Sequence, residues 1–267
     1  MEFRKFKEIV INNRLHYTDV EETLDEFYDT VNCKGDIPKL MKEIGRKLNV
    51  MIIEIPMKYD DFGAVFLNTT YSNYLLLNSN QPRNKMYFAF CHDIYHVLKG
   101  STNYINEKRE VYFNNDYTTD ENERKANLFA ANLLMPKVEF NKIYRLYKSE
   151  DLSTEDIVLK LMNYFDSTFV SVLIRLFELD ILKDINEVKP LLEIKKDDLK
   201  KKLEKLWINT EIITPTLNDE MSHVFNMIEK EGKDLIKNQF MSEYNYYKIV
   251  ERLKKMYEEI RIIDENI

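Results

Sequence analysis

The chemistry of this chain centres on two histidines that stand four residues apart. His92 and His96 lie within an apolar run, residues 88–98, whose composition predicts a helix. At 3.6 residues per turn, positions four apart differ by about 40° around the helix axis and therefore share a face. Two imidazoles on one face can hold a single metal ion. A catalytic zinc ion takes three protein ligands and keeps one position open, so the pattern requires a third ligand from elsewhere in the chain.

The residue after the first histidine is Asp93, which makes the motif H-D-x-x-H. In the widespread form, H-E-x-x-H, the glutamate is the general base of a zinc peptidase. Aspartate is shorter than glutamate by one C–C bond, about 1.5 Å, and a misplacement of about 1 Å can slow a reaction on the order of a hundredfold. Two hypotheses therefore stay open: Asp93 acts as the general base, or the site binds metal without turnover.

Few nitrogen or sulfur donors are left for the third ligand position. The chain has four histidines, and His16 and His223 have no set of partners nearby in the sequence. Cys91 adjoins the first motif histidine but lies about 100° away around the helix, which favours a packed thiol over a ligand. The third ligand is therefore expected to be a carboxylate.

A second helix, predicted over residues 119–134, offers a suitable carboxylate. Glu123 and Asn127 are four residues apart and share a face of this helix, whose three alanines allow close packing against a neighbour. Glu123 is the candidate ligand, and Asn127 could orient a ligand imidazole through a hydrogen bond. The spacing alone fits two solvated surface residues equally well.

The two motifs together resemble the ImmA/IrrE family of zinc metallopeptidases. The more specific motif is E-x-x-A-N-x-F-A-x-x-L-L-M-P, which stands at residues 123–136, some 25–30 residues after the histidine motif. The resemblance covers roughly residues 30–182. It implies a zincin-like fold and a protein substrate, since many members of the family cleave transcriptional repressors in mobile elements or stress responses.

The resemblance also implies roles for single residues. Asp93 stands in the position of the general base, and the zinc ion would be bound by His92, His96 and Glu123. Tyr95 departs from the family pattern, which usually has glycine there. The hydroxyl of Tyr95 could stabilise an oxyanion or contact the substrate, although its place in an apolar helix favours packing.

Short strands and helices are predicted around the two motifs. Apolar and β-branched stretches at residues 49–55, 63–68 and 74–78 predict three strands, joined by polar turns into a small sheet. The motif helix then extends from about residue 82 to residue 99, and the polar residues 101–118 predict a surface loop or flap. The expected fold class is α+β: a mostly helical zincin-like domain with a small three-stranded antiparallel sheet, followed by a helical C-terminal region.

The chain divides into three predicted parts. Residues 1–150 form the zincin-like metallopeptidase domain. Residues 151–182 form a helix-turn-helix-like segment whose second helix, residues 169–179, is apolar with one arginine; this favours packing on the first domain over DNA binding. Residues 183–267 form a helical region of unknown role. It ends in an amphipathic helix that either folds back on the domain, supports a homodimer or binds a partner.

Charge and composition argue against several classes of protein. The formal net charge is -7 and the pI about 5.4, so direct nucleic-acid binding is not expected. No apolar run approaches about 18 residues, which argues against a membrane span, and the N-terminus lacks the apolar stretch of a signal peptide. Two cysteines are too few for a disulfide framework. A cytoplasmic protein is expected.

Three alternatives to an active peptidase arise from the same residues. A catalytically impaired protein of the same fold would act as a protein-binding regulatory module. An HD phosphohydrolase would share the His–Asp doublet, but its site needs a closer upstream histidine than His16. A DNA-binding regulator is disfavoured by the net acidity and by the apolar helix at residues 169–179.

Overall fold

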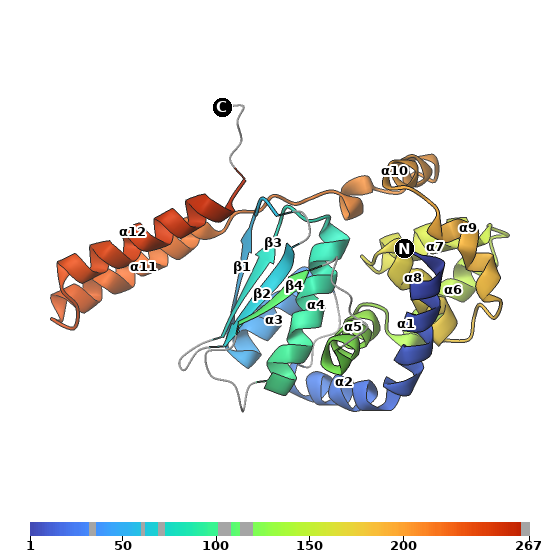
Figure 1. The fold of residues 1–267 in the computed structure, drawn as a ribbon, viewed down its shortest axis with the longest axis horizontal. Helices are drawn as coiled ribbons and strands as arrows, with labels where there is room; N and C mark the ends of the chain where they lie inside the picture. The colour runs from blue at the N-terminus through green and yellow to red at the C-terminus, as the bar shows by residue number, and fades with distance from the viewer. Residues whose placement is uncertain (32–35, 60–61, 69–72, 101–107, 113–119, 263–267) are drawn as a thin grey trace.

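The computed structural model describes residues 1–31, 36–59, 62–68, 73–100, 108–112 and 120–262. Over these residues the chain is mostly helical, with one small sheet (Figure 1). α1 (Phe3–Leu15) and α2 (Tyr17–Val31) lead into α3 (Ile37–Leu48), which begins where the side chain of Asp36 accepts a hydrogen bond from the Lys39 amide. The mostly helical α+β class that the sequence predicts is confirmed.

The sheet has four strands among the described residues, in the order β1-β3-β2-β4. They are β1 (Val50–Ile55), β2 (Phe62–Asn68), β3 (Asn73–Asn78) and β4 (Lys108–Tyr112). β3 pairs antiparallel with β2 but parallel with β1, and β2 pairs antiparallel with β4. The sheet is therefore mixed, and the predicted three-stranded antiparallel sheet is wrong in one pairing and in the number of strands.

Both differences follow from the central position of β2 and β3. Almost every residue of β2 is buried, so its backbone groups need partners on both sides. β3 lies on one side, and β4 lies on the other although its polar sequence predicted a loop over residues 101–118. β1 therefore pairs with the remaining side of β3, and the chain direction makes that pair parallel. The rest of the predicted loop lies outside the described residues.

The histidine motif lies on α4 (Arg83–Gly100), which packs against both the sheet and α5 (Glu121–Leu134) (Figure 1). Several apolar side chains of α4, among them Phe90 and Ile94, have no exposed surface. Ala126 and Ala130 of α5 are also fully buried, and their short side chains let the two helices approach closely. This packing brings polar side chains of both helices to one place inside the core.

Three further helices complete the body around α5. They are α6 (Lys137–Lys148), α7 (Thr154–Tyr164) and α8 (Phe169–Glu178). α8 buries its apolar side, and the ring of Phe177 meets Phe6 of α1 edge to face, with centroids 5.8 Å apart. No single helix in the described part of the chain is long and apolar enough to cross a membrane; α7 and α8 meet that test only as a pair bent by 107°.

The C-terminal region crosses the body and ends in a helical hairpin. Its elements are η1 (Ile185–Val188), α9 (Lys189–Leu192), α10 (Lys196–Lys205), η2 (Thr210–Ile213), α11 (Met221–Lys237) and α12 (Glu243–Ile260). α11 and α12 lie side by side and project from the body beyond β1 (Figure 1). Among the described residues, only the base of the hairpin joins the sheet: Met221 packs in an apolar cluster with Ile53 and Val65, and the Ile262 amide donates to the Pro56 carbonyl.

Candidate metal centre

α4 presents two buried imidazoles to α5. His92 has no exposed surface and His96 is 4% exposed, because the helix that carries them is packed on both sides. Their Nε2 atoms lie 3.2 Å apart. The four-residue spacing thus places both rings on one face, as helix geometry requires.

The first turn of α5 supplies a carboxylate that faces both rings. The helix begins where the Asp120 side chain accepts a hydrogen bond from the Asn122 amide, and a carboxylate in the first turn interacts favourably with the helix dipole. Glu123 lies in that turn. Its Oε2 is 3.0 Å from His92 Nε2, and its Oε1 is 3.2 Å from His96 Nε2.

These three side chains can hold a metal ion. In a tetrahedral zinc site with bonds of about 2.0–2.1 Å, neighbouring ligand atoms lie about 3.3 Å apart. The distances of 3.0, 3.2 and 3.2 Å between the two imidazoles and the carboxylate come close to that spacing. The donor set of two imidazole nitrogens and one carboxylate, converging from two packed helices, therefore fits a small divalent cation.

Asn127, one turn after Glu123, fixes the orientation of the first imidazole. Its Oδ1 lies 2.9 Å from His92 Nδ1. Because an amide oxygen only accepts hydrogen bonds, Nδ1 carries a proton and donates the hydrogen bond to Asn127 Oδ1. The lone pair of His92 Nε2 is then directed at the space shared with His96 and Glu123, as a metal ligand requires.

The charges of the site are strongly coupled. Partial burial alone would raise the pKa of Glu123, but hydrogen bonds from His92 and His96, together with their charges, hold that pKa well below its usual range. For His92, burial lowers the pKa, yet Glu123, Asp93 and Asn127 outweigh that effect and raise it. The carboxylate therefore makes His92 a stronger base, and a metal ion that binds there must compete with a proton.

Two other motif side chains beside the imidazoles are buried in α4. Asp93 has no exposed surface, and its carboxylate lies near enough to His92 for its charge to raise the pKa of that ring. Cys91 is fully buried as well, and burial raises the pKa of its thiol. Cys91 is not a member of the metal-competent group, so it behaves as a packed apolar residue.

Tyr95 lies in the core rather than on an open wall of the site. It is 5% exposed, and its ring packs edge to face against His96 and in a tilted arrangement against Phe129. Burial raises the pKa of its phenol, and the further charges that act on it belong mainly to the cluster around Lys125. Tyr95 is therefore packed in the core, where its ring supports the ring of His96.

That cluster is a second group of polar residues that the sequence did not bring together. His16, between α1 and α2, lies 3.8 Å from Glu121, and Lys125 pairs with Asp19 of α2 at 2.8 Å and with Glu121 at 2.7 Å. The atoms of His16, Asp19 and Glu121 lie close enough together for a metal ion, but the Lys125 ammonium already pairs with both carboxylates. Its role is to pin α5 to α1 and α2. Only the i,i+4 spacing of Glu121 and Lys125 could have indicated part of it.

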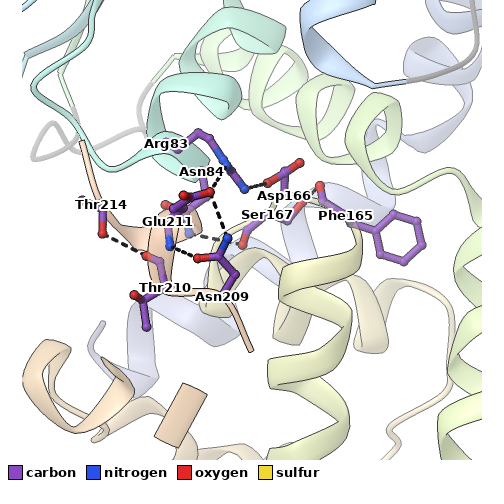
Figure 2. A network of polar contacts seen from close by, with 9 residues as sticks. All are labelled: Arg83, Asn84, Phe165, Asp166, Ser167, Asn209, Thr210, Glu211 and Thr214. Atoms are coloured by element: carbon purple, nitrogen blue, oxygen red, sulfur yellow. Dashed lines mark hydrogen bonds and ion pairs between the residues drawn. The ribbon is translucent and has the colours of Figure 1, made fainter. Parts of the chain in front are cut away.

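The N-terminal end of α4 is held by a network from distant parts of the chain (Figure 2). Arg83 donates from Nη2 to Asp166, between α7 and α8, at 2.7 Å, and its Nη1 lies 3.7 Å from Glu211 of η2. The Arg83 amide donates to the Thr214 carbonyl, and Asn84 donates to the Ser167 carbonyl. The helix that carries both imidazoles is thereby fixed to the two regions that follow it in sequence.

Comparison with known proteins agrees with this arrangement. Residues 46–177 match the model of the IrrE N-terminal-like domain of the Peptidase_M78 family. The matched span begins at the end of α3 and ends in α8, so it contains the whole sheet and both helices of the candidate site. No curated protein sequence matches the chain significantly. Through residues 46–177, the chain belongs to the ImmA/IrrE family, whose function is of the metallopeptidase type.

Proposed function

We propose that this protein is a zinc-dependent metallopeptidase whose zinc ligands are His92, His96 and Glu123. The observation that carries the proposal is the convergence of these side chains between α4 and α5: the two Nε2 atoms lie 3.2 Å apart, and the Glu123 carboxylate approaches His92 at 3.0 Å through Oε2 and His96 at 3.2 Å through Oε1. Two imidazoles and one carboxylate favour zinc over magnesium or calcium, which prefer oxygen ligands. A bound zinc ion would polarise a peptide carbonyl and lower the pKa of a water molecule.

The residues around the ligands have distinct tasks in this proposal. Asp93 accepts a proton from the attacking water at its carboxylate and returns it to the leaving amine. Asn127 keeps His92 in the tautomer that leaves Nε2 free. Tyr95 acts by packing, since its ring contacts His96 and Phe129.

The proposed substrate is a cytoplasmic regulatory protein, such as a transcriptional repressor. This substrate class comes from the family resemblance, in which repressor cleavage recurs. Direct binding of nucleic acid is not part of the proposal, because α8, the helix in the place of a recognition helix, buries its apolar side in the core.

Metal content of the purified protein tests the ligand set. Mass spectrometry should find about one zinc per wild-type chain, and the ion should be lost from His92→Ala and from Glu123→Ala. Glu121→Ala is the matched control, because Glu121 lies in the same helical turn but pairs with Lys125. Absence of zinc from the wild type after reconstitution, or loss of zinc from the control alone, would refute the ligand assignment.

A second candidate function is a metal-binding regulatory module without peptidase activity. The specific observation that favours it is the identity of residue 93, where aspartate stands in place of the longer glutamate. A shortfall of about 1.5 Å in the reach of the base would leave the metal centre intact and slow the proton transfer. Metal content alone does not separate the two candidates, so activity measurements on variants of Asp93 must do so.

A further inference from the structure

The hairpin of α11 and α12 extends well beyond the contacts at its base that join it to the body (Figure 1). Its base is held by Met221, Leu253 and Tyr257 in the apolar cluster on the sheet. Toward the tip, large apolar side chains are exposed: Phe240 is 81%, Tyr244 73% and Tyr247 65% accessible. Clusters of exposed large apolar residues on a folded protein commonly mark a binding surface.

The tip of the hairpin is a rigid turn. Just beyond the end of α11, Gln239 has the left-handed conformation at φ 61, and there the Gln239 amide donates to the Ile236 carbonyl and the Phe240 amide donates to the Leu235 carbonyl. This pair of hydrogen bonds is the Schellman helix end. α12 then begins at Ser242, whose side chain accepts from the Asn245 amide. Both helix ends are thus capped, and Phe240 is presented on a fixed backbone.

A groove of about 500 Å³ runs from this turn along one side of α12. Phe240, Met241 and Ile249 supply its apolar surface, and Lys248 and Arg252 supply its charges. None of the described residues that line it is acidic. The groove therefore combines an aromatic anchor with two cations on one helix face, which suits a ligand with apolar and anionic groups at helical spacing.

We propose that this groove docks an acidic amphipathic helix of another protein, through apolar contacts with Phe240 and Ile249 and ion pairs with Lys248 and Arg252. An aromatic anchor beside Arg is the usual composition of a binding hot spot, and a rigid anchor loses little entropy on binding. A second copy of this chain is the less suitable occupant. Pairing about a two-fold axis would place the same patch on both sides and set the cations of one copy against those of the other.

Fluorescence anisotropy with two synthetic peptides tests this assignment on the full chain. One labelled 16-residue helix carries Leu and Phe on one face and Glu on the other, and its partner carries Lys in place of Glu. The wild type should bind the Glu peptide about tenfold more tightly than the Lys peptide. Phe240→Ser should weaken binding of the Glu peptide about tenfold, and Lys248→Glu/Arg252→Glu should reverse the preference between the peptides.

A matched charge reversal provides the control. Lys230→Glu/Lys254→Glu changes the net charge of the same hairpin equally, but neither residue lines the groove, so the peptide preference should stay within about twofold of the wild type. The thermal unfolding midpoint of each variant shows that it is folded. Equal affinity of the wild type for both peptides, or equal effects of the two charge reversals, overturns the proposal. So does a wild-type dimer, detected by analytical ultracentrifugation, that Phe240→Ser dissociates.

Discussion

His92 and Asn127 join the two helices of the candidate site through one hydrogen bond, from Nδ1 of the imidazole to Oδ1 of the amide over 2.9 Å. The bond runs from the centre of α4 to α5, one turn beyond Glu123. It fixes the tautomer of His92 and holds the two helices in the register that brings Nε2 to the Glu123 carboxylate at 3.0 Å. The position of the proton on the His92 ring thus depends on Asn127, which is not one of the proposed metal ligands.

Loss of this hydrogen bond should weaken metal binding. Asn127→Ala removes the acceptor, so the His92 ring can rotate or protonate at Nε2, and zinc affinity should fall about 10- to 100-fold. Asn127→Asp keeps an acceptor and should stay nearer the wild type. Competition with a chromogenic chelator at fixed pH measures the affinity. Asn122→Ala, on the exposed side of the same helix, is the control; an equal loss there would show a general effect on α5.

Variants of Asp93 should distinguish an active peptidase from an inactive relative. If Asp93 is the general base, Asp93→Asn should slow hydrolysis at least about a hundredfold, because proton transfer typically contributes that much. The zinc-loaded proteins are assayed on a fluorescence-quenched peptide library. If the wild type instead hydrolyses no faster than His92→Ala and Asp93→Glu gains activity, the peptidase proposal fails and the regulatory module remains.

The stability of the protein should depend on the protonation of Glu54, whose backbone carbonyl accepts a hydrogen bond from the Glu220 amide at the start of α11. Burial raises the pKa of this carboxyl above 4.5. A hydrogen bond from Asn218 lowers the pKa in part, and the nearby charge of Glu220 raises it further. A carboxyl whose pKa rises on folding stabilises the protein at pH values below its pKa in the unfolded state. This stabilisation is lost as the pH rises through its pKa in the folded state. Glu54→Gln should therefore raise the unfolding midpoint by about 2 °C at pH 7.5 and change it less at pH 4.5.

Glu43→Gln is the control for that comparison. Its hydrogen bond with Arg46 lowers the pKa of the Glu43 carboxyl, so the same substitution should not stabilise the protein at pH 7.5. Thermal unfolding followed by circular dichroism at the two pH values measures both variants. A Glu54→Gln variant that is less stable than the wild type at pH 7.5 would contradict the expectation.

The ion pair of Arg83 and Asp166 should contribute measurably to stability. Its atoms lie 2.7 Å apart, and the two side chains are only 25% and 33% exposed. A double-mutant cycle of Arg83→Ala and Asp166→Ala in urea should give a coupling energy of about 1 kcal/mol. The pair of Arg46 and Glu43 serves for comparison, because Arg46 is 66% exposed; its coupling should stay below about 0.5 kcal/mol. Additive effects of the Arg83 and Asp166 substitutions would refute the prediction.

Gly232 should be needed because its lack of a side chain leaves space for the ring of Tyr246. A Cβ atom at this position would lie 2.2 Å from the nearest ring carbon, so Gly232→Ala should push the ring aside and loosen the hairpin. In a Tyr246→Ala background the same substitution meets no ring, and alanine should stabilise α11 by up to about 1 kcal/mol over glycine. Hydrogen exchange of the α11 amides in the four proteins measures this change of sign. Stabilisation by Gly232→Ala in both backgrounds would show that the ring yields at no cost.

Local patterns in the sequence were sufficient for several helices and their ends. Asp36 and Ser153 are of the residue types that favour the beginning of a helix, and their side chains accept hydrogen bonds from the amides of Lys39 and Asp156. The four-residue spacing of His92 and His96 likewise predicted that both imidazoles lie on one face of their helix. These features depend on interactions within one or two turns, which the order of residues specifies directly.

Strand pairing and the partners of distant charges could not be obtained in that way. The parallel pair of β1 and β3 and the polar strand β4 depend on which edges of β2 and β3 need partners. The contacts of Arg83 with Asp166 and Glu211 join three regions far apart in the chain. No local spacing encodes such pairs, since they form only when packing closes long loops and leaves buried polar groups to be satisfied.

The residue types at the candidate site and their division between two helices were apparent from the order of amino acids alone. Helical periodicity placed two imidazoles on one face and paired Glu123 with Asn127 on another. The sequence named Glu123 as the candidate ligand, but only the tertiary structure shows that its carboxylate meets the imidazoles, while the neighbouring Glu121 pairs with Lys125. The two glutamates lie about 200° apart around α5. The buried alanines determine which side of that helix rests on α4, and therefore which carboxylate enters the site.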